Sequence, residues 1–276
     1  MKKILTIALI VLFTNLTFGQ TYKAMTYNIR YDNPNDGDNS WPKRKAWLSS
    51  QILANTPDVI GIQEGLNHQV TYLDSVLVNY KYVGLGRDDG KTKGEYSAIF
   101  YNTNKFKVVK TKTFWLSQTP KEISVGWDAS MERICTYTLF KDKKTKTRFW
   151  VFNTHFDHIG ELARKESAKL IIETIHGLNQ HDYPVILMGD FNLKPESKPI
   201  QYLSNIFNDS KLVSATKPIG PEGTFNGFDV TKPNNDRIDY IFTSKTIKVT
   251  KYAVLSEMTS GKYPSDHLPV YIEFSL

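Results

Sequence analysis

The sequence predicts an α/β protein in which two mainly antiparallel β-sheets lie face to face and helices cover their outer sides. Short runs rich in β-branched and aromatic residues alternate with a few helical stretches, and they form two β-rich halves that each have helices of their own. No low-complexity linker divides the 276 residues, of which 40% are hydrophobic. A chain of this length and composition can bury a sizeable core.

The first 19 residues are predicted to be a signal peptide ahead of the domain, which we place at residues 20–276. The positive pair Lys2-Lys3 precedes the apolar run from Ile4 to Phe13, and Thr17-Phe18-Gly19 puts small residues three and one before a cut at Gln20. The apolar run is shorter than the about 20 residues that a membrane helix needs. We therefore expect an exported protein, periplasmic or secreted, with no stable membrane insertion after cleavage.

The N-terminal half is predicted to contain strands at 23–29, 58–64, 96–101, 106–109 and 114–116 and helices at 41–55 and 70–78. Ser40 is a typical N-cap and Pro42 suits the first helical turn, which together set the start of the first helix. The second helix is predicted from the apolar spacing of Val70, Leu73, Leu77 and Val78. The polar stretch 31–39 is expected to be a loop.

The C-terminal half is predicted to contain strands at 134–140, 149–153, 185–188, 238–242, 248–255 and 269–274 and a helix at 161–178. The run 185–188 is fully apolar, which is typical of a central strand. Leu162, Leu170, Ile172 and Ile175 are expected on the inner face of the helix. The lysine-dense segment 141–148 is interpreted first as a solvated hairpin tip and second as a contact for a polyanion.

The composition excludes several classes of protein. The 35 Lys and Arg outnumber the 28 Asp and Glu, and the formal charge of +7 falls to +5 once Lys2 and Lys3 are removed, so anionic partners are mildly favoured. Cys135 is the single cysteine, which rules out a disulfide framework and a cysteine zinc cluster. It lies in a run of strand composition and is expected to be a small buried hydrophobe. No period of 20 to 50 residues indicates a solenoid or propeller.

Polar side chains that can bind or react cluster where the apolar strands end. They are Asn28, Glu64, His155 with Asp157, Asp190 with Asn192, Asp239, and Asp266 with His267. Each alone could simply cap a turn, but functional sites are commonly built at such ends. Together they supply oxygen ligands for a hard cation, histidines with carboxylate neighbours, and amides for an oxyanion. Mg²⁺ prefers one or two carboxylates with waters and phosphate oxygens, whereas the three clustered ligands of a zinc site are not seen.

Five motifs in one order carry a family resemblance: Gln63-Glu64, Asn153-Thr154-His155, Gly189-Asp190-Phe191-Asn192, Arg237-Ile238-Asp239-Tyr240 and Ser265-Asp266-His267-Leu268-Pro269. From about Tyr22 to Phe274, the sequence resembles the endonuclease/exonuclease/phosphatase superfamily. The resemblance implies a four-layer α/β sandwich. It also implies hydrolysis of a phosphate ester by water attack at phosphorus, with Mg²⁺ as the cofactor and Mn²⁺ as the alternative ion.

The resemblance further implies a role for each matched residue. Asn28 and Glu64 match metal-site positions, and Asp266 matches an acid beside the metal. The catalytic positions are His155 for the phosphate and leaving group, Asp190 for orienting water or a leaving oxygen, Asn192 for a phosphate oxygen, and His267 with its partner Asp239 as base or phosphate clamp. Two further residues are candidates for substrate binding because of their places in the sequence. Arg133 begins a strand, and its alternative role is a structural salt bridge. Tyr96 follows Gly94-Glu95, and its alternative is a core position.

We therefore expect an exported Mg²⁺-dependent phosphodiesterase, with a nuclease acting on DNA or RNA as the first interpretation. The modest charge and the lack of a base-stacking signature leave an alternative open, a phosphodiesterase or phosphatase acting on a phosphoglycan, sugar phosphate or phospholipid head group. A non-enzymatic alternative is an inactive binding module on the same fold. The presence of Glu64, Asp190 and His267 argues against this alternative. We expect a monomer whose partner is the phosphate-ester substrate.

Overall fold

The computed structural model describes residues 20–276, and the predicted signal peptide, residues 1–19, lies outside the described residues. The first sheet contains β1 (Tyr22–Asn28), β2 (Val59–Gln63), β3 (Tyr80–Val83), β4 (Ile99–Asn102), β11 (Lys248–Val254) and β12 (Val270–Ser275). Its strand order is β11-β12-β1-β2-β4-β3. Only the β1–β2 pair within this sheet is parallel.

The second sheet contains β5 (Phe106–Trp115), β6 (Ile134–Asp142), β7 (Arg148–His155), β8 (Val185–Asp190), β9 (Asn208–Asp209) and β10 (Asp239–Thr243). Its order is β5-β6-β7-β8-β10-β9, and only β7 and β8 run parallel. The apolar strand β8 is interior to the sheet, as predicted. The lysine-dense segment 141–148 forms the turn of the β6–β7 hairpin, also as predicted.

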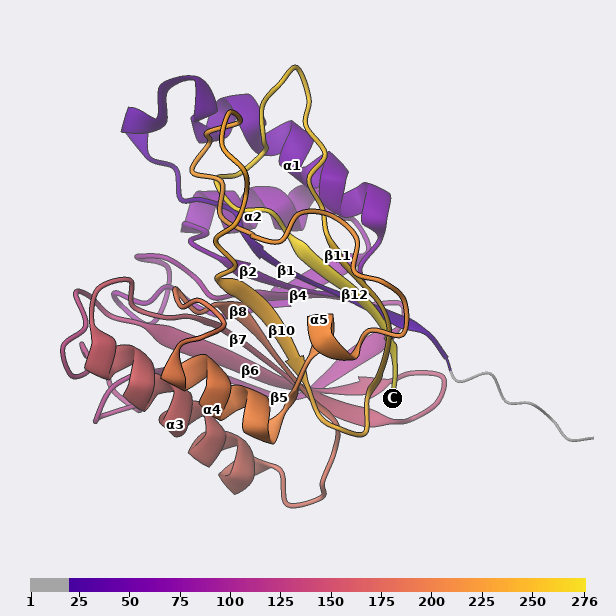
Figure 1. Ribbon diagram of the computed structural model, residues 1–276. Helices are drawn as coiled ribbons and strands as arrows, with labels where there is room; N and C mark the ends of the chain where they lie inside the picture. The colour runs from indigo at the N-terminus through magenta and orange to yellow at the C-terminus, as the bar shows by residue number, and fades with distance from the viewer. Residues whose placement is uncertain (1–19) are drawn as a thin grey trace, which may run out of the picture.

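Helices cover the outer faces of both sheets, so the molecule has four layers (Figure 1). The helices are the 3₁₀ helix η1 (Pro34–Asn39), α1 (Trp41–Asn55), α2 (Asn67–Val76), α3 (Glu161–Leu178), α4 (Lys198–Ile206) and α5 (Ser210–Val213). One apolar core lies between the sheets, a second under α1 and α2, and a third under α3 and α4. The predicted sandwich is confirmed. Within residues 20–276, no helix combines the length and apolar character needed to cross a membrane.

The differences from the predicted elements have local causes. Residues 106–115 form one strand instead of two, because the polar middle of β5 is an exposed sheet edge. The helix α2 begins at Asn67, three residues early, since the Gln69 side chain accepts the backbone N–H groups of Leu66 and Asp32. In α3, Leu162 is 45% exposed and the inner face is built on Ala163 and Ala168 instead. The polar stretch 31–39 includes η1, and the short elements β3, β9, α4 and α5 were not predicted.

A polar contact ties the two sheets together beneath the strand ends. The Gln63 amide on β2 donates to Asn153 Oδ1 on β7 at 2.6 Å, and the Asn153 amide donates to the carbonyls of Ile62 and Ala98. A Cβ on Gly61 would lie 2.7 Å from Asn153 Oδ1, so only glycine leaves room for this amide. The contact fixes the positions of the two sheets relative to each other.

Candidate functional site

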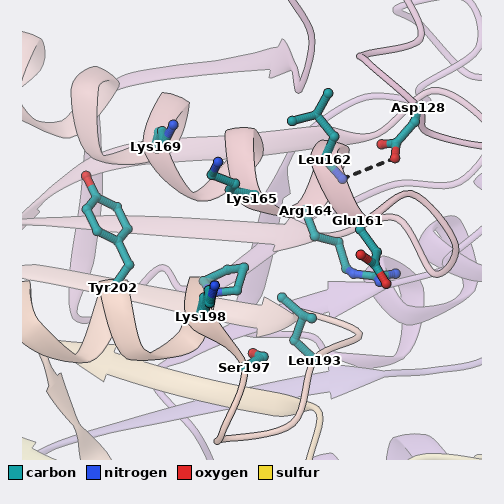
Figure 2. Close-up of a pocket in the computed structure, with 11 residues that line it drawn as sticks. Asp128, Glu161, Leu162, Arg164, Lys165, Lys169, Leu193, Ser197, Lys198 and Tyr202 are labelled. Carbon is teal, nitrogen blue, oxygen red and sulfur yellow. Dashed lines mark hydrogen bonds between the residues drawn. The ribbon is translucent and has the colours of Figure 1, made fainter.

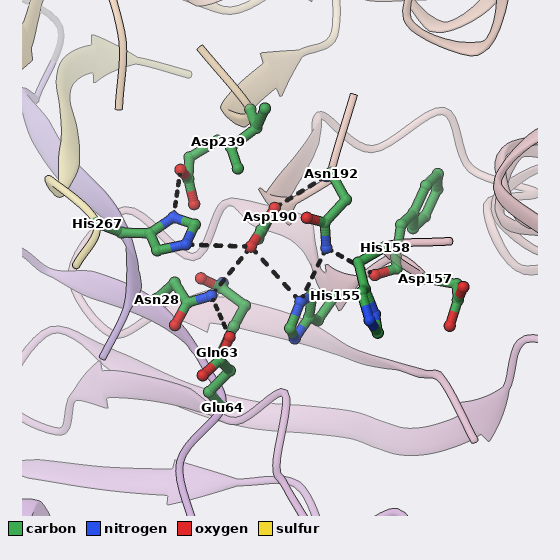
Figure 3. A network of polar contacts seen from close by, with 12 residues as sticks. Asn28, Gln63, Glu64, His155, Asp157, His158, Asp190, Asn192, Asp239 and His267 are labelled. Atoms are coloured by element: carbon green, nitrogen blue, oxygen red, sulfur yellow. Dashed lines mark hydrogen bonds and ion pairs between the residues drawn. The ribbon is translucent and has the colours of Figure 1, made fainter. Parts of the chain in front are cut away.

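The strand ends of both sheets bring the predicted polar residues together at one end of the sandwich. In the first sheet, Asn28 ends β1 and Glu64 directly follows β2. In the second sheet, Asp190 is paired with His155 on one side and with Asp239 on the other. The loop between β11 and β12 adds Asp266 and His267. Figure 3 shows four of the labelled residues around Asp190, namely Asn28, His155, Asn192 and His267, with Asp239 beside His267 and Glu64 beside Asn28.

Asp190 lies at the centre of the network. Asn28 Nδ2 donates to Asp190 Oδ2 and to Glu64 Oε1, each at 3.0 Å, so one amide joins the acids of the two sheets. The Nε2 atoms of His155 and His267 lie 3.5 and 3.7 Å from Asp190 Oδ2. Burial, and then the charge of Asp239, raise the pKa of Asp190 to about 7. A carboxyl group with such a pKa can exchange a proton near neutral pH.

His267 is held in one orientation by a buried carboxylate. Its Nδ1 lies 2.9 Å from Asp239 Oδ2, which also accepts the hydroxyl of Thr224 at 2.6 Å. Burial lowers the pKa of His267, but the carboxylates of Asp239 and Asp190 outweigh burial and raise this pKa well above its ordinary value. His267 is therefore an imidazolium near neutral pH, with Nδ1–H on Asp239 and Nε2–H directed towards Asp190.

The ion pair gives a pH dependence with a defined sign. Because the folded-state pKa of His267 is raised, the pair stabilises the protein fully below the ordinary histidine pKa of about 6.5 and loses this effect as pH rises through the raised value. We expect the Tm difference between the wild type and His267→Gln to be larger at about pH 6 than at about pH 9, measured by scanning fluorimetry in EDTA. A difference that grows towards the higher pH would contradict the assignment of the imidazolium.

His155 has the opposite protonation state. The Asn192 amide donates to the Phe156 carbonyl at 3.0 Å and to His155 Nε2 at 3.1 Å, so Nε2 is the acceptor and the ring proton is on Nδ1. Burial, followed by the charges of Arg133 and Arg87, lowers the pKa of His155 well below its ordinary value. The two histidines thus flank Asp190 as one neutral and one charged ring.

Two carboxylates face the same cavity and fit a hard cation. Glu64 Oε1 and Oε2 accept Asn28 Nδ2 and the Tyr31 N–H, which orients the carboxylate. Both carboxylates line the same cavity. Burial raises the pKa of Asp266, and the negative charge of Glu64 adds to this rise. A divalent cation would offset this negative charge, and oxygen ligands are those that Mg²⁺ prefers. Glu64 and Asp266 therefore remain the candidate metal ligands.

A second group could hold an ion by proximity alone. One ligand atom each from Asp190, Asp239 and His267 lie within 4.8 Å of one another. In this group, however, His267 Nδ1 lies 2.9 Å from Asp239 Oδ2 and His267 Nε2 lies 3.7 Å from Asp190 Oδ2, so the three side chains already pair with one another. The hydrogen bonds therefore favour a proton-carrying relay for these three residues and a metal position on the Glu64 side.

The residues surround a cavity of about 530 Å³. Seven of the predicted site residues line it: Glu64, Arg133, His155, Asp190, Asn192, Asp266 and His267. Asn28 and Asp239 are fully buried behind this wall and act on it through hydrogen bonds. Tyr96 does not line the cavity, because it is 3% exposed and its hydroxyl donates to Asn67 and to the Lys91 carbonyl. This tyrosine shapes the loop that precedes β4.

Arg133 forms the structural salt bridge that was one interpretation of its sequence position, and it also lines the cavity. Its Nε lies 3.3 Å from Asp157 Oδ2 in a buried salt bridge, and a second guanidinium nitrogen lies 2.9 Å from His158 Nδ1. The third nitrogen, NH1, is buried without a hydrogen-bond partner among the described residues. An unpaired buried donor on a cavity wall is costly unless a ligand accepts from it.

Further residues of the cavity were not predicted from the sequence. Arg30 forms a bidentate pair with Asp36, and Arg87 forms one with Glu95, so both guanidinium groups are fixed in place. Tyr31, Met131, His158, Phe225 and Ile238 complete the lining. Arg30 could have been found from its place two residues after Asn28, at the end of β1. Arg87 and Glu95 come from an irregular loop, for which no strand-end signal exists.

Three cavity residues have left-handed backbone conformations. Arg30, Glu64 and Asn192 have φ values of 55°, 62° and 50°, and each follows the end of a different strand. Such conformations are unfavourable for residues other than glycine and persist where the surrounding structure imposes them. Here they turn the chain sharply at β1, β2 and β8.

A larger cavity of about 840 Å³ lies between α3 and α4 (Figure 2). It is lined mainly by lysines and by apolar groups such as Leu162 and Leu193. The Asp128 carboxylate in this cavity already accepts hydrogen bonds from the start of α3. Its oxygens lie 3.1 Å from Leu162 N and 2.6 Å from Ala163 N. No residue of the Asp190 network lines this cavity, so the smaller one is the candidate active site.

Comparison with known proteins agrees with this geometry. Residues 25–267 match the Endonuclease/Exonuclease/phosphatase family. A mannosyl-6-phosphatase of Bacteroides thetaiotaomicron is 38% identical, with a TM-score of 0.89 over 92% of this chain and 100% of that one. An uncharacterized protein of Acanthamoeba polyphaga mimivirus is 30% identical over 85% of this chain and 92% of its own length. Human Nocturnin is 25% identical, and the match covers 85% of this chain and 58% of Nocturnin. With the motifs placed around one cavity, the chain belongs to the endonuclease/exonuclease/phosphatase family and is a phosphoesterase of that family.

Proposed function

We propose that the protein is an exported, metal-dependent phosphatase that removes a terminal phosphate from a sugar, with a 6-phosphorylated mannose as the first candidate substrate. The observation that carries this proposal is the 38% identity to a mannosyl-6-phosphatase over nearly the whole of both chains. It favours the phosphatase alternative over the nuclease interpretation of the sequence. Export rests on the sequence of residues 1–19.

The cavity suits a phosphate dianion. Arg30, Arg87 and Arg133 supply three fixed guanidinium groups on its walls, and His267 adds an imidazolium. A monoester carries more charge than a diester and has no second ester arm. A compact cavity of about 530 Å³ with several cationic donors is therefore well matched to the end of a phosphorylated sugar.

Each part of the wall has a distinct chemical task in this proposal. A divalent cation bound by Glu64 and Asp266 would neutralise phosphate charge and polarise a phosphoryl oxygen. His267 donates from Nε2 to a phosphate oxygen and is held charged by Asp239. Asp190 accepts a proton from the attacking water, since its pKa is raised to about 7. As the P–O bond to the sugar breaks, His267 gives its Nε2 proton to the departing sugar oxygen and regains one from Asp190, whose Oδ2 lies 3.7 Å away. These donors are in place before substrate binds, which lowers the cost of stabilising the transition state.

The unpaired NH1 of Arg133 predicts a role in substrate affinity. We expect Arg133→Lys to raise KM about tenfold, because a lysine keeps the charge but loses the fork that contacts Asp157 and the ligand together. The measurement is a Michaelis–Menten series with a sugar 6-phosphate. The matched control is Arg148→Lys, at the first residue of β7 and away from the cavity. An unchanged KM would make Arg133 purely structural.

The proposed function is tested with residues 20–276 in Mg²⁺. Phosphate release is measured from methyl mannoside 6-phosphate, and a mannosyl phosphodiester and single-stranded RNA are supplied in parallel. Release from the monoester that stops in EDTA supports the proposal. Shortening of the RNA with no monoester turnover would overturn the phosphatase proposal in favour of a nuclease, the second candidate. The match to the 3'-5'-exoribonuclease subunit Ccr4 of Mycosarcoma maydis favours this candidate.

A further inference from the structure

The positive charge of the chain is concentrated in two segments, which we call the basic surface. They are residues 105–112, which begin one residue before β5, and residues 141–148 of the β6–β7 hairpin. These segments contain nine of the 35 Lys and Arg and one of the 28 Asp and Glu, which leaves 26 cationic and 27 acidic side chains elsewhere. The basic surface thus has a formal charge of +8, and the rest of the chain has −1. The protein is basic because of this one region.

Strand register places most of these cations on one face. Lys107 lies opposite Lys141, and Lys141 lies opposite Arg148 in the next strand. The next two lysines of β5 lie opposite Leu139 and Tyr137, which pack in the core under α3 and α4. Directly opposed residues share a face, so these cations all point outward from the second sheet. They are Lys107, Lys110, Lys112, Lys141 and Arg148.

The basic surface has few internal counter-charges. Among residues 20–276, one of its nine cations forms an ion pair: Lys105 lies 2.7 Å from Asp58. Its single acid, Asp142, is buried and accepts the backbone N–H groups of Lys144 and Thr145. Opposed like charges such as Lys107 and Lys141 destabilise a sheet. The fold itself gains nothing from this arrangement, which therefore indicates an anionic partner.

We propose that the basic surface docks the protein on an anionic lipid bilayer. The outward cations lie at the β5 edge of the outer face, where Lys107, Lys110 and Lys112 are exposed, and none of the outward cations lines the two cavities described above. Seven of the eight unpaired cations are lysines, whose flexible, hydrated charges suit a diffuse negative surface, whereas arginine suits a fixed phosphate. The aromatic rings of β5, β6 and β7 are buried, so the surface offers no platform for nucleic-acid bases.

The position of the basic surface in the fold suits such docking. Gln20 and Tyr22 both donate to Asp142, so the described chain starts at this end of the sandwich (Figure 1). The strand β7 runs from Arg148 in the basic surface to His155 in the cavity, about 23 Å away at about 3.3 Å per residue. A bilayer bound at one end leaves the active site open at the other.

Vesicle co-sedimentation of residues 20–276 tests the proposal. Vesicles of phosphatidylcholine with about 30% phosphatidylglycerol are compared with pure phosphatidylcholine, in about 0.05 M and about 0.3 M NaCl. We expect binding to the anionic vesicles at low salt that weakens at high salt. The triple variant Lys107→Gln, Lys110→Gln, Lys112→Gln is expected to bind about 100-fold more weakly, since each lysine near an anionic surface contributes about a fivefold factor.

The matched control is Lys121→Gln, Lys198→Gln, Lys217→Gln, which removes the same charge from exposed positions outside the basic surface and is expected to bind like the wild type. If both triple variants lost vesicle binding equally, binding would depend only on net charge and the proposal would be overturned. Absence of vesicle binding, or binding to single-stranded DNA alone, would overturn it too. Phosphatase turnover is read separately and is expected to be unchanged in both variants, so failure of the proposed function would not be mistaken for failure of docking.

Discussion

Replacing Asp190 with asparagine is expected to lower kcat for a sugar 6-phosphate about 10²- to 10⁴-fold, the range usual for loss of a positioned proton acceptor. Asparagine keeps the size of the side chain and the hydrogen bond from the Asn192 N–H, which is 2.9 Å long in the wild type. It cannot accept a proton, and it turns an N–H group towards one of the two neighbouring histidines. The measurement is steady-state phosphate release at saturating substrate and Mg²⁺.

Asp182→Asn, at an exposed position before β8, is the matched control and is expected to retain wild-type kcat. Circular dichroism confirms that both variants fold. If Asp190→Asn kept kcat within a few-fold of the wild type, Asp190 would not be the proton acceptor. The buried network would then serve only to position Asn28 and the two histidines.

Replacing Glu64 with glutamine is expected to abolish the response of the protein to Mg²⁺. An ion that binds only the folded state stabilises it by mass action, and at about 100 times Kd the wild-type Tm should rise by about 5–10 °C. Glutamine removes one of the two acids that face the ion and keeps the side-chain length. The Tm of the variant should therefore stay constant as Mg²⁺ is added, and hydrolysis should fall with it.

Glu173→Gln on the exposed side of α3 is the control for this experiment, with the same chemical change far from the cavity. A full Tm response in Glu64→Gln would show that the ion is held elsewhere. Asp190 with Asp239 would then become the ligands, and the protonated state of His267 would have to be reconsidered. The titration thus separates the two candidate metal positions.

Sequence patterns predicted the site residues that follow a strand end. Glu64, His155 and Asp190 come directly after or at the end of apolar runs, and the edge where those runs stop is where they meet. The sequence could not show that Asn28 joins the acids of both sheets, because that contact depends on how the sheets face each other. Arg87 and Glu95 were missed because an irregular loop carries them.

The basic surface also depends on strand pairing that the sequence does not reveal. The lysines at 141–148 were visible as a charged hairpin tip, whereas those of β5 looked like an interruption between two short strands. Only the pairing of β5 with β6 places Lys107 beside Lys141. Tyr96 is the opposite example, a residue that the sequence suggested for the cavity and that lies outside its lining. It follows Glu95 in the sequence, but the hydrogen bonds of its hydroxyl hold it buried in the loop.

The path of the chain through the two sheets also bears on when the enzyme can become active during its synthesis. The strands β1 to β4 begin the first sheet, and β5 to β10 build the whole second sheet. Only then do β11 and β12 complete the first sheet, with β12 paired to β1 and β11 paired to β12. A nascent chain that lacks β12 therefore leaves one edge of β1 unpaired, and it has not yet placed His267. Since pairing of such distant segments is slow, we expect folding and catalytic competence to arrive together, at the last strand.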